Sequence, residues 1–141
     1  MRLNRTVGIL GGGQLARMLA IAAADLGFNT HIYCPERDSP AAQVANKMVF
    51  GNYADDKNLA DFAKNVDVLT YEFENIETKA LAELEKIVDI RPSIKSLKIS
   101  QDRLTEKSYL NSIDIKTTEF YRIDKVSEIK KILIEVINPY F

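Results

Sequence analysis

The sequence of 141 residues predicts an α/β fold built on a parallel sheet, and two observations carry this prediction. An apolar, β-branched run at 6–10 passes directly into Gly11, Gly12 and Gly13 and then into a long Ala- and Leu-rich segment, as a buried strand, a tight turn and a helix do. Short apolar runs then alternate with segments of helical spacing as far as about residue 100. Strands that alternate with helices pair in parallel through right-handed crossovers.

The first helix is predicted over 14–26, because apolar residues recur there on nearly every face and Gly27 supplies a C-terminal stop. A second strand follows at 30–34. The loop after it carries Pro35 and Pro40, which exclude a helix and a central strand. These elements form the first β-α-β unit of the predicted sheet.

The remaining elements of the first compact unit continue the alternation. They are a short helix at 41–45, strands at 47–50, 66–71 and 87–90, and helices at about 55–63, 77–85 and 93–97. Ser93 is a good N-cap for the last of these helices. The first domain is therefore placed at 1–100.

Beyond residue 100 the pattern changes. A charged helix is predicted at 102–110, a β-like stretch at 116–123 and a helix at 126–136. This segment is too short to bury a core of its own, so 101–141 is interpreted as the start of a second domain. The apolar face of the last helix favours association, and a homodimer is one form that this could take.

Composition excludes several classes of function. The 19 Lys and Arg residues nearly balance the 20 Asp and Glu residues, and the net charge of −1 gives no support to nucleic-acid or membrane-surface binding. No apolar run reaches the length of a membrane span. The single cysteine, Cys34, allows neither a disulfide framework nor a cysteine metal site, which favours a reducing cytoplasm.

The glycine turn predicts a ligand site. A helix that begins directly after it presents unpaired N–H donors, and these can bind a phosphate or a carboxylate. The spacing of Gly11, Gly13 and Ala16 also satisfies the dinucleotide-binding pattern, and Glu36 follows the second strand. An NAD(P)-binding Rossmann domain of an oxidoreductase is therefore one alternative.

Polar residues follow three of the predicted strands at the same edge of the sheet. They are Gln14, the loop at 36–39, and Glu72, Glu74 and Asn75. Carboxylates accept hydrogen bonds, so this group could hold ribose hydroxyls or an amine. The alternative is that Glu72 and Glu74 only cap the next helix.

Five blocks of sequence together resemble a known family. They are GGGQLARM at 11–18, DSPAA at 38–42, TYEFENI at 70–76, PS at 92–93 and QDRLTEK at 101–107. In this order they are similar to the N-terminal portion of the N5-carboxyaminoimidazole ribonucleotide synthases. These are ATP-grasp ligases, also called the ATPase subunit of phosphoribosylaminoimidazole carboxylase. One departure is Ala16, where the family usually has glycine.

The resemblance implies a Rossmann-like, pre-ATP-grasp domain followed by the beginning of an ATP-grasp domain. It implies an ATP-dependent carbon–nitrogen ligase of purine biosynthesis that couples bicarbonate to 5-aminoimidazole ribonucleotide, with carboxyphosphate as intermediate and Mg²⁺ on the phosphates. By position, Gln14, Leu15 and Glu74 are expected to contact the substrate ribonucleotide. Arg103 is expected to contact the phosphates of ATP, because its guanidinium matches phosphate oxygens.

The same resemblance places a lysine that holds ATP and the acidic metal ligands beyond Phe141, and the catalytic residues, which the sequence does not identify, are expected there as well. No metal site is therefore expected within these residues, and the chain alone is expected to be inactive. A non-catalytic remnant with an interaction role is a further alternative.

Overall fold

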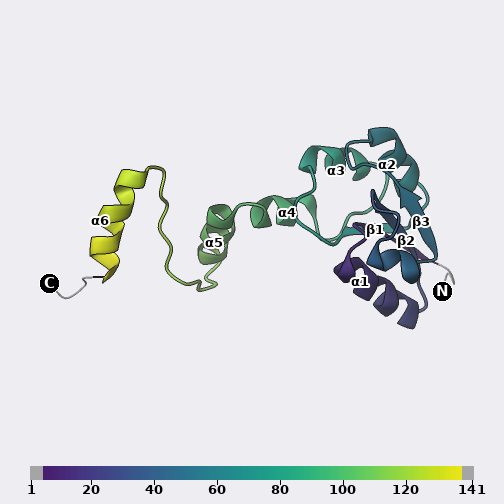
Figure 1. The fold of residues 1–141 in the computed structure, drawn as a ribbon, viewed down its shortest axis with the longest axis horizontal. Coiled ribbons are helices and arrows are strands. Elements are labelled where there is room, and N and C mark those ends of the chain that lie inside the picture. Colours follow the sequence, from purple (N-terminus) through teal and green to yellow (C-terminus); the bar gives the residue numbers. More distant parts are fainter. Residues whose placement is uncertain (1–4, 138–141) are drawn as a thin grey trace. The chain divides into compact units, whose positions relative to one another are not determined.

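The computed structural model describes residues 5–137. It divides into two compact units, Met1–Gln101 and Asp102–Phe141, which are described separately. Figure 1 labels the helices and strands of both units. No helix in the described part of the chain combines the length and the apolar character needed to cross a membrane.

Unit 1 contains a four-stranded sheet in the order β3-β2-β1-β4. Its strands are β1 (Thr6–Leu10), β2 (Asn29–Cys34), β3 (Lys47–Phe50) and β4 (Val68–Tyr71). All three pairings are parallel, which confirms the predicted fold class. Because β2 and β4 lie on either side of β1, the glycine turn after β1 sits where the strand order reverses, the usual ligand-binding position in such sheets.

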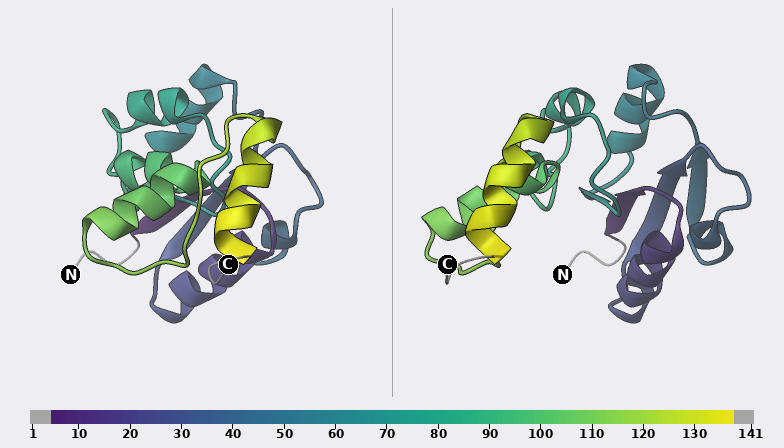
Figure 2. Two further views of the ribbon diagram at one scale, coloured as in Figure 1. Left: turned by 90° about the vertical axis from the view of Figure 1, so that its left-hand side faces the viewer. Right: turned by 60° about the vertical axis from the view of Figure 1, so that its left-hand side comes forward.

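Helices cover both faces of this sheet (Figure 2). They are α1 (Gln14–Asp25), the 3-10 helix η1 (Pro40–Gln43), α2 (Asp56–Ala63), α3 (Thr78–Leu84) and α4 (Ile94–Ser100). Neighbouring residues of a strand point to opposite faces, so Ile9 packs with Ala16 of α1 and Ala41 of η1, whereas Leu10 packs in the core formed by α2, α3 and α4. The two cores hold the carboxyl ends of the strands in place.

The predicted strand at 87–90 is wrong. The helical turn after α3 continues into this apolar run, where Ile87 and Val88 both donate to the Leu84 carbonyl, at 2.8 and 3.0 Å. The run reaches the sheet only at its end, where Ile90 forms an isolated bridge to Leu69. In this bridge the Leu69 N–H donates to the Asp89 carbonyl and the Arg91 N–H donates to the Leu69 carbonyl, both at 2.9 Å. An apolar run of this length does not distinguish the end of a helix from a short strand.

Unit 2 contains α5 (Arg103–Ser112) and α6 (Val126–Ile137), which confirms two of its predicted elements. The β-like stretch predicted at 116–123 is wrong, because no strand forms among the described residues of this unit. A lone strand has no partner for its backbone groups, and here α5 itself has no buried residue against which a sheet could pack.

Candidate functional site

The carboxyl edge of the sheet carries a pocket of about 480 Å³. Four segments line it: the glycine turn, the loop after β2, Tyr53 in the loop after β3, and Glu72 with Phe73 after β4. All four follow parallel strands and therefore emerge at the same edge. Sequence reasoning missed Tyr53 because it considered the loops after only three of the four strands.

The glycine turn is shaped by close packing. Gly11 has a φ of 112°, and its N–H donates to the Tyr33 carbonyl at 2.9 Å. A Cβ on Gly12 would lie 2.5 Å from Cys34 Sγ and 2.7 Å from Ser39 Oγ. The turn therefore needs glycine at these positions whether or not a ligand is bound.

Glu72 reaches from the end of β4 to the start of α1. Its Oε1 accepts the Gly13 N–H at 2.7 Å, and its Oε2 accepts the Ala16 N–H at 2.6 Å. Gly13 is the N-cap residue of α1 and has no side chain of its own to do this. The alternative that Glu72 only caps the following helix is thus wrong, because Glu72 caps α1. It also takes two of the N–H donors that were expected to bind an anion.

Gln14 and Leu15 follow the N-cap of α1, and their N–H groups have no acceptor among the described residues. This is expected at the first positions of a helix, where the backbone has no partner within the helix. Both side chains are exposed, and neither lines the pocket. The backbone N–H groups of these two residues, rather than their side chains, are therefore available to a ligand at this end of α1.

Glu74 is exposed and does not line the pocket, unlike Glu72 two residues earlier. Its backbone carbonyl accepts a hydrogen bond from Gln101 Nε2 at 2.6 Å, and the same nitrogen donates to the Ile76 carbonyl at 2.9 Å. The Gln101 amide thus ties the loop after β4 to the end of α4. Sequence reasoning noted Gln101 only as the first residue of a block.

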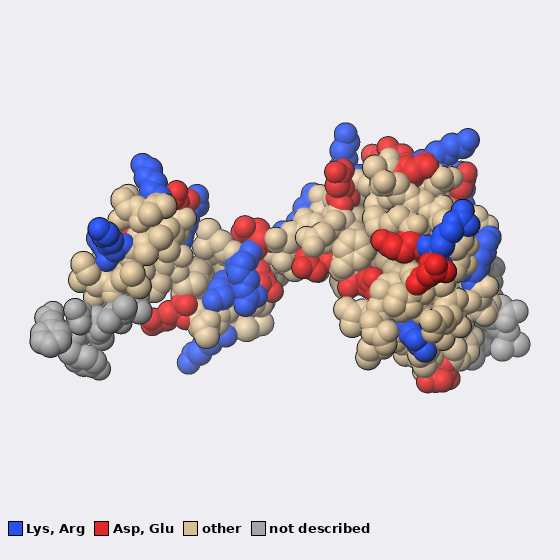
Figure 3. All heavy atoms as spheres, viewed as in Figure 1, with Lys and Arg blue, Asp and Glu red and all other residues tan. Residues whose placement is uncertain are grey.

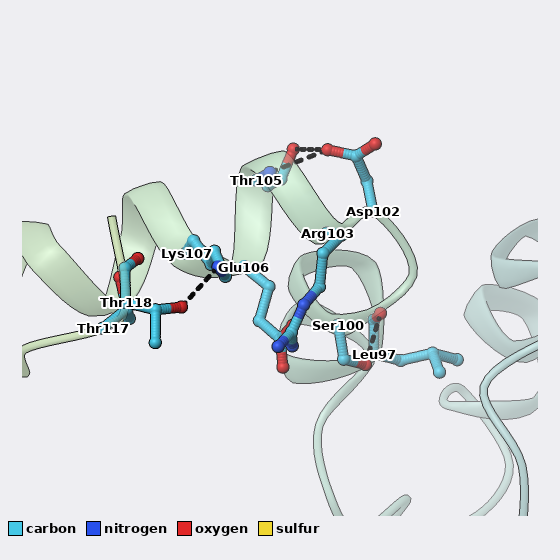
Figure 4. A network of polar contacts seen from close by, with 9 residues as sticks. All are labelled: Leu97, Ser100, Asp102, Arg103, Thr105, Glu106, Lys107, Thr117 and Thr118. Carbon is cyan, nitrogen blue, oxygen red and sulfur yellow. Dashed lines mark hydrogen bonds and ion pairs between the residues drawn. The ribbon is translucent and has the colours of Figure 1, made fainter. Parts of the chain in front are cut away.

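Arg103 belongs to unit 2, where it is the first residue of α5. Figure 4 shows its side chain beside Glu106, with which it forms an ion pair. Asp102 caps the helix by accepting the Thr105 N–H at 2.7 Å, and the hydrogen bonds from Thr105 lower the pKa of its carboxyl. The Arg103 guanidinium remains exposed, so a ligand could replace the surface ion pair at little cost.

The pocket in unit 1 is acidic. Its lining includes the carboxylates of Glu36, Asp38 and Glu72, and it contains no Lys or Arg. Tyr53 adds a phenol group whose pKa is raised, chiefly by burial, so it keeps its proton near neutral pH. Carboxylates only accept hydrogen bonds, so the pocket fits hydroxyl and amine donors better than a phosphate.

Charge is distributed differently outside the pocket. The face of the molecule in Figure 3 carries both signs of charge interspersed over unit 1.

The described residues also contain no group of three or more His, Cys, Asp or Glu side chains that could hold a metal ion. This part of the chain therefore offers no site at which three or more such side chains would hold a metal ion by themselves.

A parallel sheet with a glycine turn and a polar pocket at its carboxyl edge defines a ligand-binding domain of the Rossmann-like class. Residues 4–101 match the family model described as "Ribonucleotide synthetase preATP-grasp domain". This chain therefore belongs to that family.

Similar proteins agree with this assignment. The chain is 46% identical over 134 residues to "Bifunctional purine synthesis protein purC/E" of Dictyostelium discoideum, covering 95% of the chain and 13% of that protein. It is 48% identical over 124 residues to "N5-carboxyaminoimidazole ribonucleotide synthase" of Brucella melitensis, covering 88% of the chain and 34% of that protein. It thus spans at most about a third of the length of these two relatives.

One solved structure is similar in fold and carries both ligands of interest. It is N5-carboxyaminoimidazole synthase from Aspergillus clavatus in complex with ADP and 5-aminoimidazole ribonucleotide. The TM-score is 0.82 at 31% identity, and the match covers 96% of this chain and 37% of that chain. The family resemblance drawn from the sequence blocks is therefore confirmed.

Proposed function

We propose that this chain is the substrate-side portion of an N5-carboxyaminoimidazole ribonucleotide synthase. The reaction joins bicarbonate to the exocyclic amine of 5-aminoimidazole ribonucleotide and converts ATP to ADP and phosphate. The observation that carries the proposal is the family match over residues 4–101, which contains the whole pocket. The Aspergillus clavatus structure supports it, because that related protein holds the same ribonucleotide.

In this proposal the ribonucleotide binds at the carboxyl edge of unit 1. The Gln14 and Leu15 N–H groups donate to it, and the carboxylates of Glu72 and Glu74 accept from its hydroxyls or amine. Arg103 contacts the phosphates of ATP from unit 2, where its permanent charge suits that task. Mg²⁺, when bound, would neutralise part of the charge on the ATP phosphates.

The proposed reaction requires a nucleophilic amine. Carboxyphosphate, formed from bicarbonate and ATP, offers its carbon to that amine; the new C–N bond forms as the C–O bond to phosphate breaks and the amine loses a proton. Holding the amine in one orientation favours this attack.

The buried, free thiol of Cys34 supports a reducing cytoplasm as the setting in which the protein works.

Calorimetric titration with 5-aminoimidazole ribonucleotide tests the proposal directly. We expect saturable but weak binding, because the residues that line the pocket offer few hydrogen-bond donors to the ribonucleotide. A parallel titration with NADH, followed by its fluorescence, tests the alternative of a nicotinamide-binding domain. Saturable NADH binding without ribonucleotide binding would favour that alternative.

Glu74→Ala is expected to weaken ribonucleotide binding by about tenfold, the loss of one hydrogen bond to a charged group. The melting temperature is expected to stay unchanged, because an exposed carboxylate contributes little to folding. Calorimetry and thermal unfolding measure the two effects.

Glu77→Ala is the matched control for this variant. Glu77 is an exposed carboxylate in the same loop, and it makes no side-chain cap bond at the start of α3. Equal losses of affinity in both variants would contradict a specific contact from Glu74, and a large drop in melting temperature for Glu74→Ala would assign it a structural role.

A further inference from the structure

The Glu72 carboxylate fills the N-terminal end of α1 from a distant part of the chain. It lies 59 residues from Gly13 and 56 from Ala16, and it bonds their N–H groups at 2.7 and 2.6 Å. These are the distances of charge-assisted hydrogen bonds. A glycine turn before a helix commonly binds phosphate with such N–H groups, and here a side chain of the protein occupies that position.

The charge of Glu72 matters as much as its hydrogen bonds. A helix N-terminus carries roughly half a positive charge, and one carboxylate more than neutralises it. A phosphate approaching the turn would meet this carboxylate together with those of Glu36 and Asp38 in the same pocket. Like charges at such short range disfavour binding, whereas a hydroxyl or an amine can donate to the same oxygens.

We propose that Glu72 is a specificity-determining residue that excludes phosphate groups from the glycine turn. Of the first four N–H groups of α1, it leaves those of Gln14 and Leu15 for a ligand. A ribonucleotide then enters with its hydroxyl- and amine-bearing part in the pocket and its phosphate directed away from α1. The identity of the ribonucleotide rests on the proposed function, but the exclusion of phosphate does not.

The close contacts of the turn support this assignment. A Cβ on Gly13 would lie 2.7 Å from Glu72 Oε1, and a Cβ on Gly11 would overlap the Glu72 side chain. Two of the three glycines therefore make room for this carboxylate. The absence of a side chain at Gly11 and Gly13 thus lets the Glu72 carboxylate pack against the turn.

Titration of the labelled chain with inorganic phosphate, followed by amide NMR, tests the exclusion. In the wild-type chain the amide resonances of residues 13–16 should not move. In Glu72→Gln, which removes the charge but keeps the size of the side chain, the same resonances should shift saturably, with phosphate affinity raised about tenfold or more.

Glu36→Gln is the control, because it removes one charge from the same pocket without a bond to α1. In the Glu36→Gln chain the amide resonances of residues 13–16 should not move when phosphate is added. An equal gain of phosphate binding in both variants would overturn the proposal in favour of a general effect of pocket charge. A folded Glu72→Gln chain that does not bind phosphate would overturn it as well.

The wild-type titration with phosphate tests the exclusion even if the Glu72→Gln chain does not fold. Phosphate-induced shifts at residues 13–16 of the wild-type chain would overturn the exclusion, and their absence supports it. A separate titration with 5-aminoimidazole ribonucleotide should move the Gln14 and Leu15 resonances. If the ribonucleotide does not move these resonances and phosphate does not either, the result counts against the proposed function and leaves the exclusion of phosphate standing.

Discussion

Gly11→Ala is expected to lower the free energy of unfolding by about 4 kcal/mol, a large share of the stability of a small domain. The φ of 112° at Gly11 is strained for any residue with a Cβ. The added methyl group would also overlap the Glu72 side chain. Glu72 could move aside only by giving up its two hydrogen bonds to the start of α1, at 2.7 and 2.6 Å.

Chemical denaturation followed by circular dichroism measures this effect, and Gly27→Ala is its control. Gly27 also has a positive φ, of 79°, but a Cβ there would meet no atom within 4 Å. We expect this second variant to lose about 1 kcal/mol from backbone strain alone. Equal losses in the two variants would show that Glu72 yields to the methyl group at no cost, contrary to its role as the cap of α1.

Local sequence patterns predict most of unit 1 because each strand and helix there has its own period and its own stop signal. The three glycines after 6–10 and Gly27 after α1 are examples. The strand at 87–90 could not be distinguished in this way, since an apolar run serves the end of a helix and a strand equally well. In the structure Ile87 and Val88 bond back to the Leu84 carbonyl in the turns that follow α3, so the run does not form a strand.

The sequence predicts the edge of the sheet at which the pocket lies, but not the contacts among the residues there. Parallel strands bring Glu36 and Glu72 to one edge, and the sequence shows that both residues follow strands. No local pattern shows that Glu72 turns back across 59 residues to bond Gly13, because this depends on β4 lying beside β1. All four N–H groups at the start of α1 lack a partner within the helix, and this long-range contact determines that the Gly13 and Ala16 groups are bonded and the Gln14 and Leu15 groups are not.

The identities of Gln14, Leu15, Glu74 and Arg103 as binding residues stay predictions from the family resemblance. The structure adds a physical distinction among them. Gln14 and Leu15 offer backbone donors at a helix start that Glu72 partly fills. Glu74 and Arg103 offer exposed charged side chains, whose contribution depends on what a ligand or another part of the protein brings to them.

The isolated 141-residue chain is expected to release no ADP above background in the presence of ATP, bicarbonate and 5-aminoimidazole ribonucleotide. Phosphoryl transfer depends on several positive groups and Mg²⁺ around the phosphates, and the loss of a single such group typically costs orders of magnitude in rate. Among the described residues Arg103 is the proposed phosphate contact, and no side-chain cluster that could hold a metal ion is present.

A coupled assay of ADP release, with Arg103→Ala as the background control, measures this prediction. Bicarbonate-dependent release by the wild-type chain above that control would contradict it. The region of the Brucella melitensis relative that this chain does not match, about two thirds of that protein, can then be added as a separate polypeptide. Restored turnover that is lost again with Arg103→Ala would assign Arg103 to the nucleotide site and this chain to the substrate side of a ligase assembled from two pieces.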